Sequence, residues 1–211
     1  MKANAISAVL FDLGGVLVQV DSSQSFIELA EILGSSPDEL RAAMRSDLLT
    51  AYEKGEITSD EFYIQLQARC DGEGVLSQDA FRSHWQNVLF PNHGMIQFLK
   101  RVTEHYPVWF LSNTNQYHYD ILMADFEFMR LAKGGIYSFL EGTMKPEARI
   151  YEITKARIPF PVESILFIDD LEENIAGARQ AGFATVLFKS REDLCEQLKS
   201  RYPDVGENLC A

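Results

Sequence analysis

Five short runs of mostly apolar residues constrain the fold of this chain more than any other feature of its sequence. Each run is rich in β-branched, leucine and aromatic residues, and most of them lack the alternation of polar and apolar positions that marks a half-exposed strand. Continuous apolar runs of this kind are typical of parallel strands that helices cover on both faces. The five runs are Ile6–Phe11, Val108–Leu111, Gly135–Phe139, Ser164–Ile168 and Ala184–Phe188.

Segments with helical spacing separate these runs. Apolar residues recur on one face of His93–His105. Pro146 predicts the start of another helix, because proline suits the first helical turn. Strands that alternate with helices predict an α/β fold with right-handed crossovers. We therefore expect a Rossmann-like parallel sheet with helices on both faces.

One connection, residues 19–90, is too long for an ordinary loop. Its pattern is helical: Phe26, Leu29, Ala30 and Leu33 share a face, and Ser59 marks a second helix start. A structureless loop of this length is uncommon inside a compact domain. We therefore expect a small α-helical cap at 19–90, inserted after the first strand, and a Rossmann-like core formed by 1–18 and 91–211.

Charge and cysteine content exclude several functions. The 19 Lys and Arg residues against 31 Asp and Glu residues give a net charge of −12. No basic cluster offsets this charge, so we expect no nucleic acid and no membrane as partner. Three cysteines without CxxC spacing predict neither a zinc site nor a disulfide framework. Free thiols and the lack of a signal peptide favour a cytoplasmic protein.

Polar residues collect where three of the predicted strands end. Asp12–Gly15 follows the first run, Ser112–Asn115 the second, and Asp169-Asp170 the fourth. Each pattern alone is more often a turn or a helix cap than a site. In open α/β sheets, however, ligands bind beyond the carboxyl ends of the strands. We therefore expect the three segments to converge on one site.

The acids of these segments suit a hard cation. Mg²⁺ takes one or two carboxylates together with water and phosphate oxygens, and it would screen the acids from an anionic substrate. Lys145, just before Pro146, would supply a positive charge for a phosphate, although a lone lysine is usually a solvated surface residue.

Four segments, taken in order, resemble the motifs of the haloacid dehalogenase-like hydrolases, in particular the phosphatases with a helical cap. The order and spacing of all four agree with the family and span most of the chain, which makes the resemblance specific. Ser112–Asn115, Lys145–Tyr151 and Gly55–Ile57 are most similar to bacterial sugar-1-phosphate phosphatases of the α-D-glucose-1-phosphate phosphatase type. The four segments are Val9–Val16, Phe110–Thr114, Met144–Tyr151, and Leu166–Asp170 with Asn174.

The resemblance implies a phosphatase that acts on a small phosphorylated metabolite, such as a sugar 1-phosphate. Asp12 would be the nucleophile and would form an aspartyl-phosphate. Ser112 and Asn113 would bind the phosphoryl oxygens. Lys145 would neutralise charge on the phosphoryl group and on the nucleophile.

The resemblance also implies Mg²⁺ as cofactor. Asp12, the backbone carbonyl of Gly14 and Asp170 would hold the ion, and Asp169 would be a further ligand or an acid behind the ligands. Which of Asp169 and Asp170 touches the metal stays open at this point. Mg²⁺ would act as a template and a Lewis acid.

Gly14 departs from the usual family pattern. Most phosphatases of the family have a second Asp two positions after the nucleophile, where it acts as general acid and base. A glycine keeps the backbone carbonyl but loses a proton donor that is typically worth about 10²–10⁴-fold. We expect either a slow phosphatase or one whose ester needs little protonation of the leaving group, such as an anomeric sugar phosphate. The glucose-1-phosphate phosphatases that this sequence resembles also carry Gly here.

Two other functions stay open. In a 2-haloacid dehalogenase, Asp12 would attack carbon without a metal, but unscreened Asp169 and Asp170 would burden a site for a carboxylate substrate. A catalytically weak member of the family could instead serve as an interaction module, which Gly14 motivates. We expect a monomer or a small homo-oligomer.

The cap is expected to cover the site and to set its specificity. The sequence does not decide which cap residues contact the substrate. His118, on the helix after the second motif, is a further candidate to line the site. The cap candidates are Arg45, Tyr52, Arg82 and Trp85.

Overall fold

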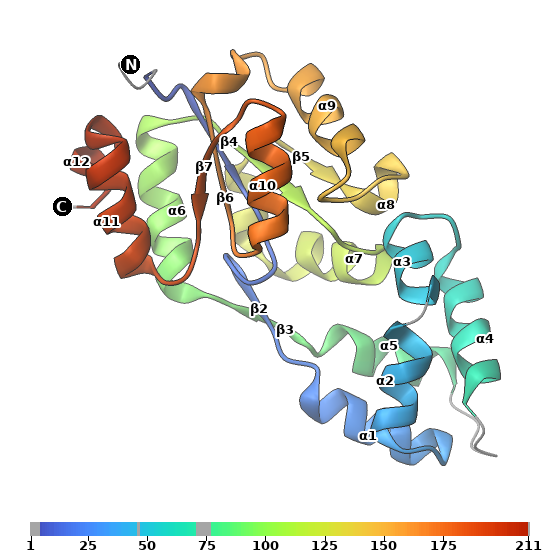
Figure 1. Ribbon diagram of the computed structural model, residues 1–211. Helices are drawn as coiled ribbons and strands as arrows, with labels where there is room; N and C mark the ends of the chain where they lie inside the picture. The colour runs from blue at the N-terminus through green and yellow to red at the C-terminus, as the bar shows by residue number, and fades with distance from the viewer. Residues whose placement is uncertain (1–4, 46, 71–76, 211) are drawn as a thin grey trace.

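A computed structural model describes residues 5–45, 47–70 and 77–210, without the side chains of Arg45 and Gln86. Five parallel strands form one sheet in the order β5-β4-β1-β6-β7 (Figure 1). Each predicted run overlaps one of these strands, so the predicted α/β fold is confirmed. The strands are β1 (Ala8–Phe11), β4 (Val108–Ser112), β5 (Gly134–Tyr137), β6 (Ile165–Asp169) and β7 (Ala184–Leu187).

Helices cover both faces of the sheet because successive strand residues point to opposite sides. Val9 and Phe11 contribute to one apolar core, whereas Ala8 and Leu10 contribute to the other. On the first face lie α6 (His93–His105), α7 (Gln116–Asp125), α11 (Arg191–Arg201) and α12 (Pro203–Leu209), and on the second lie α9 (Ala148–Arg157) and α10 (Glu172–Gln180). The remaining short elements of this part are α8 (Ser138–Glu141), η1 (Glu127–Leu131) and η2 (Val162–Ser164).

In the described residues between β1 and α6 there are five helices, which lie below the sheet in Figure 1. A short antiparallel pair, β2 (Val18–Val20) with β3 (Leu89–Pro91), carries the chain out to these helices and back. The sequence analysis missed this pair because each strand is only three residues long. The helices are α1 (Ser23–Leu33), α2 (Pro37–Arg45), α3 (Asp47–Glu53), α4 (Ser59–Arg69) and α5 (Gln78–Gln86), which we call the cap helices.

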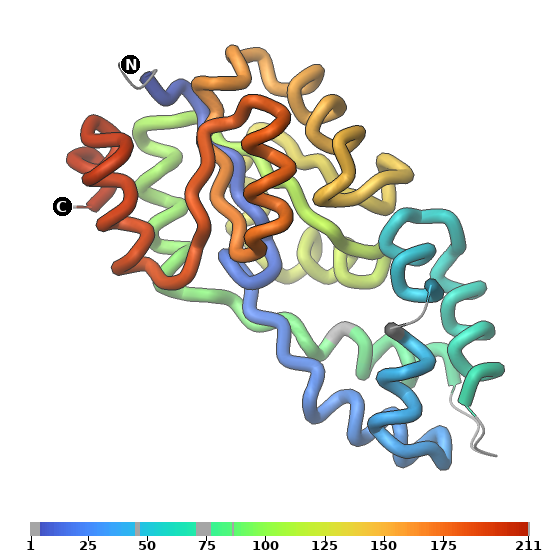
Figure 2. Tube along the Cα trace, viewed as in Figure 1, coloured from blue at the N-terminus to red at the C-terminus, as the bar shows by residue number. Residues whose placement is uncertain are grey.

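The cap helices have an apolar core of their own, and the neighbouring sheet domain contributes to it. Tyr117 of α7 packs into this cluster beside Tyr52 and Phe81. Gly55, after α3, has φ +66° and lies so close to the backbone carbonyl of Phe139 that a Cβ would overlap it. These contacts seat the cap helices on α7 and α8, as the tube in Figure 2 also shows. No helix in the described ranges is long and apolar enough to cross a membrane.

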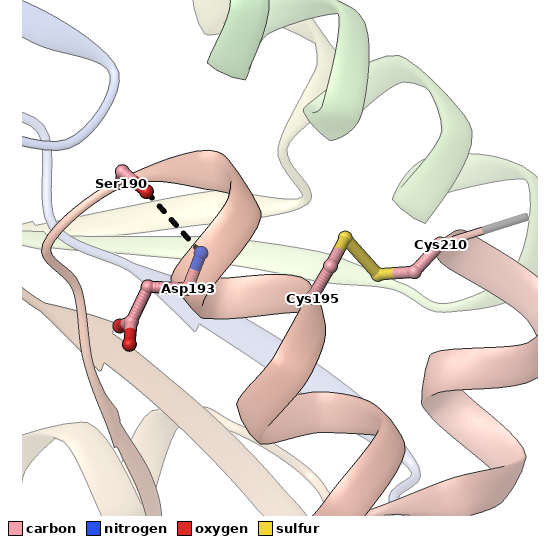
Figure 3. Close-up of a disulfide and its surroundings, with 4 residues drawn as sticks. All are labelled: Ser190, Asp193, Cys195 and Cys210. Atoms are coloured by element: carbon pink, nitrogen blue, oxygen red, sulfur yellow. Dashed lines mark hydrogen bonds between the residues drawn. A yellow bond between two sulfur atoms is a disulfide. The ribbon is translucent and has the colours of Figure 1, made fainter.

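Cys195 and Cys210 form a disulfide, which corrects the prediction that the cysteines are free thiols (Figure 3). Helix α11 begins at Arg191 after the Ser190 cap, whose hydroxyl accepts from the Asp193 amide at 3.2 Å, and α12 then turns back beside α11. This turn brings the two Cα atoms to 5.5 Å across 15 residues. The spacing of the two cysteines in the sequence does not by itself reveal such a turn. The argument from free thiols to a reducing compartment therefore loses its basis.

Candidate active site

The carboxyl ends of β1, β4 and β6 meet at one edge of the sheet, because the strands are parallel. A cavity of about 370 Å³ opens there. Ser112 and Asp169 lie at the ends of their strands but do not line it. The cavity is lined by Asp12, Gly14, Gly15, Val20, Asn113, Lys145, Asp170, Leu171 and Asn174.

Lys145 is the centre of the site. Its side chain is about 1% exposed, and its ammonium donates to three oxygens, which uses all three of its protons. The acceptors are Asp12 Oδ1 at 2.9 Å, Asp169 Oδ2 at 2.7 Å and the Leu111 carbonyl at 3.0 Å. Burial alone would lower the pKa of Lys145, but the two carboxylates outweigh it and raise the pKa. Lys145 is therefore a fixed, buried positive charge.

Asp12 follows β1 directly, and its backbone amide donates to the Ile168 carbonyl at 2.9 Å. Oδ1 accepts from the Leu13 amide at 2.7 Å as well as from Lys145. These two donors fix the plane of the carboxylate at the cavity. Burial raises the pKa of Asp12, and the ammonium of Lys145 opposes that rise. A buried carboxylate held in one orientation beside a cation has the geometry that a nucleophile needs.

Asp169, at the end of β6, is fully buried, and both of its oxygens have protein partners. Oδ1 accepts from the Leu171 amide at 2.8 Å and from Asn174 Nδ2 at 3.0 Å, and Oδ2 accepts from Lys145. With its acceptor sites taken, Asp169 is suited to position Lys145. It is less suited than its neighbour Asp170 to bind a cation.

Asp170 is half-buried and borders the cavity. Burial and the nearby charge of Asp169 raise its pKa. Among the described residues, no other side chain donates to its carboxylate, which therefore has room for a cation. Gly15 makes this position possible, because it has φ +72° and a Cβ there would overlap the Asp170 carboxylate.

Asn113 joins the second and third predicted motifs. Its Oδ1 accepts from the Lys145 amide at 2.8 Å and its Nδ2 donates to the Lys145 carbonyl at 2.9 Å. This pairing holds Lys145 and Pro146 in a turn whose connecting peptide bond is cis. The helix predicted to start at Pro146 is present as α9, which begins at Ala148. Ser112, behind Asn113, donates from its hydroxyl to the Asn113 carbonyl at 3.4 Å.

The donor set fits a magnesium ion. One oxygen from each of Asp12, Asp169 and Asp170 lies within 4.8 Å of the others. Asn174 Oδ1, which is buried, has no hydrogen-bond partner in the described part of the chain, although Asn174 lines the same cavity. A buried acceptor without a donor needs an ion or a bound water. Carboxylate and carbonyl oxygens are the ligands that Mg²⁺ prefers.

Gly14 lies in the same cavity and forms a bridge with Val18. A Cβ built on Gly14 would meet only the Val20 side chain, at 3.9 Å. The position therefore has space for a side chain. The sequence analysis gave no role to Gly15 or Asn174, and the only available signals were the Gly-Gly dipeptide and the asparagine near Asp170.

The predicted cap candidates and His118 lie in different places. Trp85 and His118 line a second cavity that borders the site, described below. Tyr52 is buried and accepts from the Tyr117 amide at 3.2 Å, and Arg82 lies over the Tyr117 ring at 5.6 Å, so both support the cap rather than this cavity. The side chain of Arg45 is outside the described part of the chain.

The fold and the acidic cluster define a class of α/β enzymes that bind a cation and an anionic group at one edge of the sheet. The family model of haloacid dehalogenase-like hydrolases matches residues 6–182. The chain belongs to this family of hydrolases.

Known relatives were found by sequence and by structure. A D-ribitol-5-phosphate phosphatase of Bacteroides thetaiotaomicron is 28% identical over 92% of this chain and 97% of the relative. A sesquiterpene phosphatase of Aspergillus oryzae is 26% identical over 91% and 94%. A drimenol cyclase of Aspergillus calidoustus is 26% identical over 96% of this chain, which spans only 38% of the cyclase.

The fold similarity extends to a structure with ligands. A haloacid dehalogenase family enzyme of Bacteroides thetaiotaomicron, in complex with magnesium and inorganic phosphate, is 25% identical with a TM-score of 0.78. The similarity covers 89% of this chain and 96% of that enzyme. The predicted family is confirmed, whereas the likeness to glucose-1-phosphate phosphatases stays a prediction.

Proposed function

We propose that this chain is a Mg²⁺-dependent phosphatase that hydrolyses a small phosphorylated metabolite through an aspartyl-phosphate. One observation carries the proposal: the buried ammonium of Lys145 joins Asp12 to Asp169, with the Asp170 carboxylate at the same cavity. The phosphatases among the relatives and the structure with magnesium and phosphate support it.

Asp12 is the proposed nucleophile. Its carboxylate attacks phosphorus, the bond between phosphorus and the ester oxygen breaks, and the alcohol leaves with that electron pair and takes up a proton. Water then attacks the aspartyl-phosphate, which releases inorganic phosphate and restores the carboxylate of Asp12. Lys145 holds Asp12 in place and balances its charge, so that an anionic substrate meets less repulsion.

Mg²⁺ would be held by Asp12, Asp170 and the backbone carbonyl of Gly14. When bound, the ion supplies positive charge to the phosphoryl oxygens. We assign Asp169 to a different task, because Lys145, Asn174 and the Leu171 amide already engage its oxygens. Asp169 orients the ammonium of Lys145, and Asn113 holds the Lys145 backbone. Phosphoryl transfer depends mainly on this kind of positioning and charge balance.

Two substrate classes have support. A sugar phosphate, predicted from the sequence, is consistent with a relative that is a ribitol-5-phosphate phosphatase. A phosphate of an apolar alcohol is consistent with a relative that is a sesquiterpene phosphatase. The absence of an acid at Gly14 favours, in either class, an ester whose leaving group needs little protonation.

The test is phosphate release from sugar phosphates, nucleotides, alkyl phosphates and para-nitrophenyl phosphate, with and without Mg²⁺. We expect release that requires Mg²⁺ and that Asp12→Asn abolishes. Halide release from 2-haloacids without Mg²⁺ would replace the proposal with the dehalogenase alternative. No release from any ester at high enzyme concentration would favour the interaction module.

A further inference from the structure

A second cavity, of about 260 Å³, lies where the cap helices face α7. Most of its surface is apolar, and we call it the cap cavity. Its apolar walls come from β2, four cap helices and the segment after α5, whereas Asn115 and His118 close it from the sheet domain. The apolar lining residues are Val20, Phe26, Leu29, Met44, Leu49, Trp85 and Val88.

The polar groups that the sheet domain adds to the cap cavity are already engaged. His118 Nε2 lies 3.1 Å from the Trp85 carbonyl, and its Nδ1 lies 3.2 Å from Asn115 Nδ2. Asn115 Oδ1 accepts from the His118 amide at 3.1 Å. Burial lowers the pKa of His118 to about 4, so its ring is neutral at pH 7. These groups offer little hydrogen bonding to a ligand.

The charged side chains that the cap adds are also engaged, with one exception. His84 Nδ1 pairs with Glu28 at 2.9 Å, and Arg41 pairs with Asp38 at 3.1 Å while it lies over the Phe26 ring. Glu53 is the exception, because it is mostly buried and has no partner in the described ranges. A polyol needs a hydrogen-bond partner for each hydroxyl that loses water. Beside these engaged groups, the described lining offers the hydroxyls of Ser22 and Ser25 and the carboxyl of Glu53, which are too few for a polyol.

The cap cavity lies next to the cavity that contains Asp12. Val20 lines both cavities. The loop after β4 also serves both, since Asn113 lines the site and Asn115, two residues later, lines the cap cavity. A phosphate held beside Lys145 therefore has an apolar space next to it, on the side toward which its organic group can extend.

We infer that the cap cavity receives the organic part of the substrate and that this part is largely hydrocarbon. The inference rests on the proposed phosphatase function and names its substrate class. Hydrocarbon is the group that such walls bind, since burial of apolar surface is favourable and leaves no polar group without a partner. A sugar phosphate, by contrast, would lose hydrogen bonds to water that the engaged polar groups do not replace.

The experiment is a series of n-alkyl phosphates from methyl to octyl, kept below their critical micelle concentrations. We expect kcat/KM to rise by roughly three- to fourfold for each added methylene, until the chain fills the cavity and the value levels off. Ribitol 5-phosphate, glucose 1-phosphate and phosphocholine are run beside the series. We expect each of them to react more slowly than the best alkyl phosphate. A flat alkyl series, or a preference for a polyol or for the choline ester, would overturn the inference.

A matched pair of variants on α1 tests whether the cap cavity itself causes kcat/KM to rise with the length of the alkyl chain. Ser25 is buried and lines the cavity, whereas Ile27 is 49% exposed and lies outside its lining. Ser25→Phe fills part of the space, so its kcat/KM should level off at a shorter chain. Ile27→Phe adds the same ring to the outer surface and should leave the series unchanged. Identical series for wild type and Ser25→Phe would overturn the assignment, provided that both variants melt at the wild-type temperature.

Two readouts separate failure of this inference from failure of the proposed function. Hydrolysis of para-nitrophenyl phosphate together with a flat alkyl series would leave a phosphatase whose organic group binds elsewhere. Calorimetric titration with octylphosphonate, which has no ester bond to break, measures binding without turnover. Tight binding that Ser25→Phe weakens supports the cap cavity even if no ester is hydrolysed, whereas no binding counts against it.

Discussion

The site at the strand ends and the cap cavity both contain buried acids, but the surroundings of these acids differ in whether a cation pairs with them. At the site, Asp12 and Asp169 share the ammonium of Lys145 at 2.9 and 2.7 Å. In the cap cavity, Glu53 has no ion-pair or hydrogen-bond partner among the described residues. Burial of an ionised carboxylate is costly unless a partner offsets the loss of water. The site therefore provides a cation for its buried acids, whereas the cap cavity provides none for Glu53.

The causes of the pKa shifts follow this difference. Burial raises the pKa of Glu53 to about 7, with no opposing charge. At the site, burial also raises the pKa of Asp12 to about 7, but Lys145 opposes this rise. A carboxylate paired with a cation suits phosphoryl chemistry, and a mostly apolar cavity suits an apolar group. The comparison thus assigns the phosphate to one region and the organic group to the other, and the following variants test it.

The largest effect is expected from Asp12→Asn. The variant keeps the shape of the side chain but removes the nucleophilic carboxylate, so kcat should fall by about 10⁴-fold or more. Phosphate release measured in a stopped assay checks this. Unfolding by urea serves as the control, because a loss of activity through misfolding would show as a lower midpoint. Residual activity within tenfold of wild type would remove Asp12 from the role of nucleophile.

Lys145→Met should damage both activity and stability. It leaves Asp12 and Asp169 buried without their cation, and removal of one partner of a buried ion pair costs about 3–5 kcal/mol. The control is Lys54→Met, which breaks the half-exposed pair with Glu147 at 2.5 Å and should cost less than about 1 kcal/mol. Urea unfolding of the two variants makes the comparison. Equal losses would show that burial does not distinguish the two ion pairs.

Glu53→Gln should stabilise the protein, and more so at high pH. The folded-state pKa is raised to about 7 from an ordinary value of 4.5, so the folded state binds the proton more tightly. This contribution to the free energy of unfolding is therefore lost as the pH rises from 4.5 to 7. The glutamine variant avoids the loss, and it should gain about 3 kcal/mol at pH 8 but only about 1 kcal/mol at pH 5.

Urea unfolding at both pH values measures the gain of Glu53→Gln. Glu56→Gln, at an exposed acid three residues further along the chain, is the matched control. An equal gain at pH 5 and pH 8 would mean that Glu53 titrates as an ordinary acid, and the contrast between the two regions would then fail.

Gly15→Ala and Gly14→Ala form a pair of neighbouring substitutions with different expected effects. A Cβ on Gly15 overlaps the Asp170 carboxylate and sits at φ +72°, whereas a Cβ on Gly14 has 3.9 Å to its nearest neighbour. Displacing a group at the metal site typically costs about 10–100-fold in affinity. We expect that loss in Mg²⁺ affinity for Gly15→Ala and a change of less than about threefold for Gly14→Ala. Calorimetric titration with Mg²⁺ measures the affinity of each variant. Equal affinities of Gly15→Ala and Gly14→Ala would argue against Asp170 as a ligand.

Much of the fold could be predicted because it depends on local pattern. The five strands follow from continuous apolar runs and the His93–His105 helix from apolar periodicity, and the sequence displays both directly. The strand pair at the cap boundary and the Cys195–Cys210 disulfide did not follow. Each depends on contacts between segments that lie far apart or turn back in the fold. A strand of three residues is too short to show a hydrophobic pattern, and a pair of cysteines shows none.

The candidate site divides in the same way. The strand-end acids and Lys145 could be named because residue type and order reveal them. The different tasks of Asp169 and Asp170 could not, because they depend on the partners of each oxygen in three dimensions. Glu53 could not be singled out either, since nothing in a helical sequence distinguishes an acid that faces a cavity from one that faces solvent.

Gly14→Asp should have the smallest effect and the most specific one. The nearest atom to a Cβ at Gly14 belongs to Val20, the residue that lines both the site and the cap cavity. An acid there would stand between the phosphate and the organic group, where a leaving oxygen needs its proton. A well-placed general acid gives about 10²–10⁴-fold, and an added one without optimised surroundings should give roughly tenfold.

The gain of Gly14→Asp should appear only with poor leaving groups. We expect kcat to rise for an alkyl phosphate and to stay level for para-nitrophenyl phosphate, whose phenolate leaves without a proton. Gly14→Asn, of the same shape but without an acidic proton, is the control and should raise neither rate. Equal gains with both esters would mean that the new side chain acts on the phosphoryl group. No gain with the alkyl ester would mean that protonation of the leaving group does not limit this enzyme, and Gly14 would then be no handicap to it.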